Sequence, residues 1–356
     1  MKNCIFCGKE IDKESVEHIL LNSLGGKLTC KNIICKSCNN FFGTEIDSKL
    51  CDVLYPYASL LNVNRDRGNN KNILTNDDTD YYMKPMGVPV LKKYKISEEN
   101  IDGGNVHISI EASDIKQAKQ AIKWLKSKYG NRLDENSFAI ETKNEFLNEK
   151  IPFKIMVSPE MFPSIIKTAI EFCKVKLDFD ISYAIRRFNN KDYNNCYYCF
   201  ADIVKVNFKS IFHILYLFTY KGSLYCYVNY FGIIGFIVKL TDGINIAVEE
   251  SYVYDLLSER IVNLHSYNLN KNLLDNFGFN NNFTTHDFDM LRMRISNFIS
   301  LYYKTSEQEI IKRLIDEAMN ETFSNNNEFI TEQDYKVFTN KLLAKLAPYL
   351  SYWMNE

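Results

Sequence analysis

The sequence predicts an α+β protein, with a small cysteine-rich module followed by a larger α+β domain that has an antiparallel sheet and a helical C-terminus. Five of the ten cysteines fall within the first 38 residues. Runs rich in Phe, Tyr, Val and Ile fill residues 197–255, as strands require. The last seventy residues return to apolar residues at helical spacing. The 356 residues suffice for about two domains.

Composition excludes a disordered chain and a membrane-spanning one. The sequence is 46% hydrophobic, which is enough apolar material to bury a core. The longest apolar region, 210–240, is interrupted by Lys221-Gly222 and lacks the roughly 20 apolar residues of a membrane helix. The first residues lack the apolar stretch that a secretory signal requires. We therefore expect a cytoplasmic protein without a membrane partner.

The cysteines of the first module form two pairs, Cys4-x-x-Cys7 and Cys35-x-x-Cys38. Four thiolates at this spacing suit a tetrahedral structural Zn²⁺. The alternative is two unrelated pairs of buried cysteines. Because so short a segment has few large apolar side chains, metal binding would supply much of its folding energy.

The residues around these pairs carry a second pattern. Glu17-His18-Ile19 precedes Ser23-Leu24-Gly25-Gly26, then come Asn32-Ile33-Ile34 and, directly after Cys38, Asn39-Asn40. From Cys4 to about Leu50 the chain resembles the HNH endonucleases of the ββα-metal class. The resemblance implies a zinc-stapled module of two strands and a helix, and the setting of a phage, mobile-element or antiviral defence protein.

The resemblance also implies roles for individual residues. His18 would be the general base that deprotonates the attacking water. Asn39 and Glu17 would hold one catalytic cation, with Asn40 as the alternative amide ligand, and these oxygen donors suit Mg²⁺ or Mn²⁺. Asn32 would be the scaffold residue that orients the loop near His18.

Other readings of these residues stay open on the sequence alone. His18 would otherwise be a zinc ligand or a surface histidine. Asn39 or Asn40 would otherwise be an ordinary helix cap, although one residue can cap a helix and bind a metal.

The chain divides by composition into a nuclease module (1–62), a linker or loop (63–82) and an α+β domain for substrate recognition or regulation (83–356). In the last of these, residues 106–113 alternate as a strand, and Asp114 then begins a helix. A second strand over 152–157 should precede a helix that begins at Ser158 and Pro159. The remaining predicted features are a tight turn at Lys221-Gly222 and helix starts at Ser306-x-x-Glu309 and Thr331-x-x-Asp334.

The charges do not mark the first module as a nucleic-acid surface. Residues 1–60 hold seven lysines and seven acidic residues, and the whole chain has a net charge of −1. Phosphate contacts are therefore expected partly from elsewhere. The candidates are Arg65, Arg67 and a helical stripe of Lys116, Lys119, Lys123 and Lys126, which would otherwise be an ordinary solvated face.

These features together predict a metal-dependent endonuclease that acts on DNA, with RNA the less favoured substrate. One alternative is a zinc-binding module that binds nucleic acid or protein without cutting. Another is a sensor whose C-terminal domain controls the nuclease. A homodimer or a regulatory partner protein is compatible with all three.

Overall fold

The computed structural model describes residues 3–11, 16–101, 105–133, 139, 141, 151–153, 156–204, 210–262, 270–323 and 331–353. Its contacts divide the chain into two compact units. The first unit joins residues 1–70 to residues 156–356, and the second unit is residues 71–155. The N-terminal module is thus packed in the same unit as the C-terminal part of the chain.

The N-terminal segment has the order strand, strand, helix. Strands β1 (Val16–His18) and β2 (Thr29–Lys31) form an antiparallel hairpin in which His18 lies opposite Thr29. A short 3₁₀ turn, η1 (Asn22–Leu24), lies between them. The helices α1 (Lys36–Phe41) and α2 (Asp47–Leu60) follow, joined by one π-helical turn, η2 (Phe42–Ile46).

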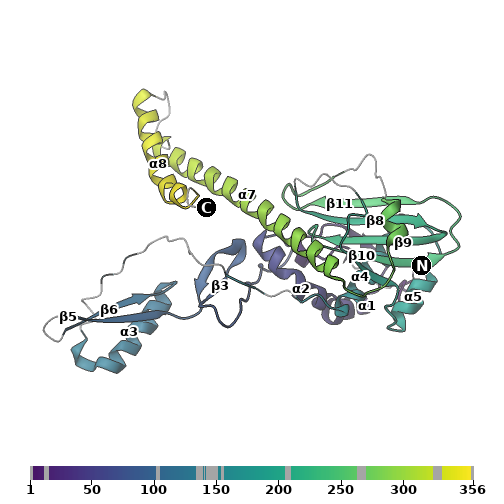
Figure 1. The fold of residues 1–356 in the computed structure, drawn as a ribbon, viewed down its shortest axis with the longest axis horizontal. Coiled ribbons are helices and arrows are strands. Elements are labelled where there is room, and N and C mark those ends of the chain that lie inside the picture. Colours follow the sequence, from purple (N-terminus) through teal and green to yellow (C-terminus); the bar gives the residue numbers. More distant parts are fainter. Residues whose placement is uncertain are drawn as a thin grey trace. The chain divides into compact units, whose positions relative to one another are not determined.

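A six-stranded antiparallel sheet forms the centre of the first unit (Figure 1). Its order is β12-β11-β8-β9-β10-β7, and its strands are β7 (Cys196–Cys199), β8 (Phe212–Tyr220), β9 (Ser223–Tyr230), β10 (Ile234–Asp242), β11 (Glu249–Asp255) and β12 (Arg260–Ile261). The predicted antiparallel sheet is confirmed. Lys221 and Gly222 both have positive φ, 48° and 75°, as a two-residue hairpin turn between right-twisted strands requires.

Helix α4 (Phe162–Lys176) packs against the sheet beside the shorter α5 (Ser182–Asn189) (Figure 1). The predicted start is confirmed: Pro159 opens a 3₁₀ turn that leads into α4. Nearly the whole of α4 from Phe162 to Cys173 is buried, because one side faces the sheet and another faces the N-terminal segment. The strand predicted over 152–157 falls partly outside the described residues, and the described ones among them are not in a strand.

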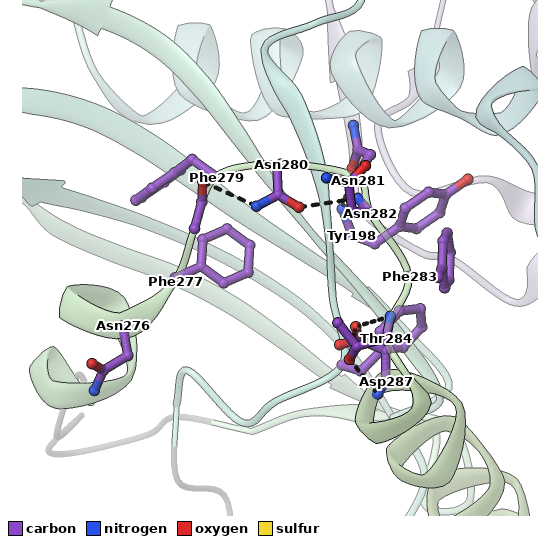
Figure 2. Close-up of a pocket in the computed structure, with 12 residues that line it drawn as sticks. Tyr198, Asn276, Phe277, Phe279, Asn280, Asn281, Asn282, Phe283, Thr284 and Asp287 are labelled. Atoms are coloured by element: carbon purple, nitrogen blue, oxygen red, sulfur yellow. Dashed lines mark hydrogen bonds between the residues drawn. The ribbon is translucent and has the colours of Figure 1, made fainter.

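The edge strand β7 is covered by the loop after α6 (Lys271–Asn276), which also lines a pocket (Figure 2). Asn281 pairs with the strand as a neighbouring backbone would: its Oδ1 accepts from the Tyr198 amide at 3.1 Å and its Nδ2 donates to the Cys196 carbonyl at 3.0 Å. Asn280 bonds within the loop, to Gly278 and Asn282. The loop thereby protects an edge that would otherwise invite strand pairing.

Two long helices end the chain, α7 (Thr285–Phe323) and α8 (Glu332–Trp353). The start predicted at Ser306 is wrong, because α7 runs through it; the cap is instead Thr284, which exchanges hydrogen bonds with Asp287. The start at Thr331 is confirmed by the same exchange with Asp334. Within the described part of the chain, no helix is both long and apolar enough to cross a membrane.

The described residues of the second unit form two small antiparallel hairpins and one α-helix. Their elements are β3 (Tyr81–Met83), β4 (Pro89–Leu91), β5 (Lys95–Ile101), β6 (Asn105–Glu111) and α3 (Ile115–Tyr129). The predicted strand and capped helix are confirmed, since the Asp114 side chain accepts from the amide of Gln117 at the start of α3.

A buried ion cluster joins the N-terminal segment to α4. The ammonium of Lys167 lies 2.7 Å from Glu17 Oε1 and 2.9 Å from Asp47 Oδ2. A third carboxylate, Glu171 Oε2, lies 3.8 Å away. Lys167 is fully buried, so its charge depends on these partners. Asp47 also accepts from the hydroxyl of Ser164 at 2.6 Å.

The carboxylates of this cluster differ in their surroundings. Burial raises the pKa of Glu17, although Lys167 opposes the rise. Burial also raises the pKa of Glu171 well above its ordinary value, and Lys167 again opposes the rise. Among the described residues, neither Glu171 carboxyl oxygen has a hydrogen-bond partner. The cluster therefore relies on Lys167 remaining charged, and the three acids raise the pKa of Lys167 against the effect of its burial.

A buried histidine on the sheet makes a second link to the N-terminal segment. His213 Nε2 lies 2.9 Å from the carbonyl oxygen of Leu24 at the end of η1. Its Nδ1 accepts from the Phe231 amide at 3.3 Å. Both partners fit the neutral ring, with the proton on Nε2. Burial lowers the pKa of His213 to about 4.

We predict that Lys167→Met destabilises the protein by about 3 to 5 kcal/mol, because it leaves Glu17 and Asp47 buried without their cation. Urea unfolding at pH 7 measures the change in the free energy of unfolding. Lys174→Met is the matched control, since Lys174 lies on the same helix and pairs at 3.6 Å with the exposed Asp178. Equal stability losses in the two variants would contradict a structural role for the cluster.

We also predict that stability falls on acidification through His213. The unfolded chain binds a proton near pH 6.5, whereas the folded chain resists it down to about pH 4. The folded state therefore loses about 2 to 3 kcal/mol between pH 7 and pH 4.5 on account of this group. Urea unfolding of the parent and of His213→Gln should show their free-energy difference narrowing by that amount. If the free energies of unfolding of the two proteins changed in parallel with pH, the prediction for His213 would be wrong.

Candidate functional site

The two cysteine pairs meet in space. Cys4 and Cys7 lie in a turn where Gly8, at φ 72°, donates its amide to the Cys4 carbonyl at 2.9 Å. Cys35 lies at the N-cap of α1, and Cys38 lies in its first turn. The four Sγ atoms are all within 4.8 Å of one another. Segments separated by about 30 residues of chain thus converge on one point.

The geometry of these thiols fits a tetrahedral metal. Zn–S bonds of about 2.3 Å place sulfurs about 3.8 Å apart. The Sγ atoms of Cys7 and Cys35 are 3.7 Å apart. Although burial opposes ionisation of Cys35, hydrogen bonds from Ser37 and Cys38 lower its pKa to about 6. The cluster is therefore consistent with a structural zinc.

His18 lies at the end of β1 on the solvent side. Along this strand Val16 is exposed, Glu17 is buried and His18 is partly exposed, as alternation in a strand requires. The His18 side chain keeps 31% of its surface exposed, and its Nε2 lies 3.1 Å from Asp66 Oδ2. The imidazole is thus neither a ligand of the cysteine cluster nor part of the core.

The glycine pair beside His18 is required by space as well as by backbone conformation. Gly25 has φ 86°, in the left-handed region. A Cβ on Gly26 would lie 2.4 Å from the Leu20 carbonyl oxygen, so no other residue fits there. The loop can therefore fold back closely over the end of β1.

Glu17 and His18 lie on opposite faces of β1. Glu17 is 4% exposed and is bound to Lys167 in the buried cluster. The structure does not bring its carboxylate to the face that carries His18.

The two candidate asparagines of α1 differ in what they reach. Asn39 Nδ2 donates to the Val16 carbonyl at 3.4 Å, so its side chain lies against β1. Val16 is two residues from His18 on the same face, a separation of about 7 Å along a strand. Asn40 is exposed, and its backbone carbonyl accepts a hydrogen bond from the Thr44 hydroxyl at 3.3 Å.

Asn32 lies in the connection between β2 and α1. Its φ of 62° is left-handed, a conformation that asparagine tolerates better than most residues. Its neighbour Ile33 accepts a hydrogen bond from the Ile5 amide at 3.0 Å, which ties this connection to the first cysteine turn. Asn32 is therefore placed where the chain turns from the hairpin into the helix.

The candidate basic residues fall into two groups. Arg67 is exposed and Arg65 is partly exposed, and they flank the Asp66 that contacts His18. Arg65 donates to the Asn69 carbonyl at 2.9 Å. The stripe of Lys116, Lys119, Lys123 and Lys126 is exposed on α3, which belongs to the second unit.

Sequence reasoning missed three residues at this site. Asp66 fell in the segment predicted as a linker, and Lys167 and His213 were given no role. Each contacts the N-terminal segment only through the tertiary fold. The sequence offered a signal for one of them, Lys167, which is a lysine on an otherwise apolar face of a predicted helix.

The comparisons with known proteins agree with the geometry. Residues 4–54 match the family model described as HNH endonuclease. No curated protein and no solved structure matches the chain. The matched range includes both cysteine pairs and the hairpin between them. Residues 4–54 are therefore an HNH endonuclease domain with a four-cysteine cluster.

Proposed function

We propose that the protein is a metal-dependent endonuclease that hydrolyses phosphodiester bonds in DNA with His18 as its general base. The main observation that supports this proposal is the position of the His18 imidazole, which is partly exposed at the end of a hairpin strand inside the matched domain. A neutral imidazole can take a proton from water as a general base. The hairpin and the cysteine cluster give it a rigid frame, which such chemistry needs.

The proposed ligands of the catalytic ion are Asn39 and Glu17, with Mg²⁺ or Mn²⁺ as the ion. When bound, the ion would stabilise negative charge on the scissile phosphate and the leaving oxygen. Asn39 fits this role, because its amide nitrogen faces Val16 and leaves its carbonyl oxygen for a cation. Glu17 already binds the Lys167 ammonium on the face of β1 opposite to His18, so it would join the ion only by leaving that partner and moving to the His18 face.

The four cysteines are the proposed ligands of a structural zinc. Asn32 is the proposed scaffold residue, because it turns the chain between the hairpin and α1. Zinc would hold the first cysteine turn against this connection and so keep Asn39 beside β1. The two metals would then have separate tasks, one in folding and one in hydrolysis.

DNA is the proposed substrate, with RNA the less favoured one. Arg65 and Arg67 next to the His18 site would contact phosphates. Residues outside 4–54 would select the DNA or regulate access to it. We further propose a role in phage, mobile-element or antiviral defence biology, as the resemblance implies.

A second candidate function is a domain that binds nucleic acid without cutting it. The observation that favours it is the pairing of Glu17 with Lys167, which occupies one proposed ligand of the catalytic ion. The cleavage experiment below separates the two candidates, because only a nuclease loses an activity when His18 is replaced.

We predict that His18→Ala abolishes cleavage of supercoiled plasmid in Mg²⁺ or Mn²⁺, with a loss of about 100-fold or more, because the attacking water loses its base. Gel assays of nicked and linear product measure the rate. His286→Ala is the control, since His286 is exposed on α7. The proposal fails if the parent is inert across DNA and RNA substrates, or if the parent and His18→Ala cut equally.

We also predict one zinc per chain, lost in Cys35→Ser, because removing one thiolate opens the tetrahedral shell. Elemental analysis gives the stoichiometry, and thermal unfolding with and without a chelator gives the stabilisation. Cys51→Ala is the matched control, because Cys51 lies outside the four-cysteine cluster and bonds Ser23. Zinc retained in Cys35→Ser, or lost equally in Cys51→Ala, would contradict the site.

A further inference from the structure

His18 contacts a residue, Asp66, that lies outside the part of the chain that matches the family. Asp66 is beyond residue 54, yet its Oδ2 is 3.1 Å from His18 Nε2. Among the residues that the structure describes, one titratable side chain other than His18 contacts this carboxylate: the Nζ of Lys27 lies 3.2 Å from Oδ1. The carboxylate thus bridges an imidazole and an ammonium.

The position of Asp66 is set by the loop that surrounds His18. The Asp66 amide donates to Asn22 Oδ1 at 2.9 Å, and Asn22 belongs to η1. Lys27 also donates to the carbonyl of Asn64 at 2.9 Å. Two residues of the hairpin connection therefore hold the segment 64–66 over the end of β1, on the same side as the imidazole.

This arrangement is poorly suited to stabilising the fold. The side chains of Asp66, His18 and Lys27 are 53%, 31% and 29% exposed. Exposed ion pairs contribute little to the free energy of folding, because water and salt screen them. The contact adds little to the free energy of folding but orients the candidate base, so we assign it a role in the reaction.

The chemical consequence concerns the tautomer of His18. Hydrogen bonds from His18 and Lys27 lower the pKa of Asp66, so its carboxylate is ionised and can only accept. The nitrogen that faces it, Nε2, must then carry the hydrogen. In the neutral ring this leaves the lone pair on Nδ1, which becomes the atom able to take a proton from water.

We propose that Asp66 is a positioning residue that fixes the Nε2–H tautomer of His18 and thereby makes Nδ1 the general base. This inference rests on the proposed nuclease function. Asp66 itself does not touch the reacting atoms; it acts through the ring that it orients.

Two replacements of Asp66 separate this role from a general effect of charge. In Asp66→Asn, Lys27 attracts the amide oxygen, and the amide nitrogen then faces Nε2 and donates to it. The hydrogen of the ring moves to Nδ1, which removes the base. In Asp66→Leu the ring has no partner and both tautomers are populated.

The tautomer can be read without any cleavage assay. Ring ¹⁵N shifts of ¹⁵N-histidine-labelled protein, at a pH where the rings are neutral, distinguish a protonated from an unprotonated nitrogen. The chain has five histidines, and His18→Gln assigns the signal of His18. We expect Nε2–H in the parent, Nδ1–H in Asp66→Asn and a mixture in Asp66→Leu.

Cleavage should follow the tautomer. Plasmid kcat should fall roughly 10- to 100-fold in Asp66→Leu and further in Asp66→Asn, with KM little changed. Adding Lys27→Met to Asp66→Asn frees the amide to turn its oxygen to Nε2, and it should restore both the parent tautomer and part of the rate. Glu45→Gln is the control, because Glu45 is an exposed acid within residues 4–54.

The outcomes distinguish this inference from the nuclease proposal. An Nδ1–H ring in the parent, or the same tautomer in all variants, overturns the role of Asp66 whatever the cleavage rates. Lost cleavage with an unchanged tautomer also overturns it and indicates that Asp66 contacts the ion or the DNA. An inert parent whose ring responds as expected overturns the nuclease proposal alone.

Discussion

The first unit depends on the burial of the Lys167 ammonium among carboxylates from two distant parts of the chain. Glu17 and Asp47 come from the HNH domain, whereas Lys167 and Glu171 lie on α4. A buried cation without partners is far too costly to persist, so the domain and the helix must keep this arrangement together. Specific pairing, more than net stabilisation, is what such a cluster supplies.

Strand β1 shows how this constraint shapes the candidate site. Its alternation sends Glu17 inward to Lys167 and His18 outward to solvent. The short strand β1 therefore anchors the domain with one face and presents the candidate base on the other. His213 supports the adjoining loop from the sheet through the Leu24 carbonyl. Contacts with the C-terminal part of the chain therefore hold the site in place.

Local sequence patterns were sufficient to predict features in which a residue interacts with its near neighbours in the chain. The cysteine pairs, the Lys221-Gly222 turn and the Thr331 cap all follow from short-range geometry, and the structure contains each of them. The Ser306 start failed because a capping pattern inside a continuing helix has no free backbone amides to satisfy. Thr284 and Asp287 carry the same chemistry where the helix does begin.

The sequence by itself determined the four-cysteine cluster, the HNH motif and the antiparallel sheet, because spacing and alternation encode them. Only the tertiary structure decided that Glu17 faces Lys167, that Asn39 reaches β1 and that Asp66 contacts His18. The physical reason is distance along the chain: 48 residues separate His18 from Asp66, and 120 separate Asp47 from Lys167. Partners so far apart are chosen by packing of whole elements, which no local pattern records.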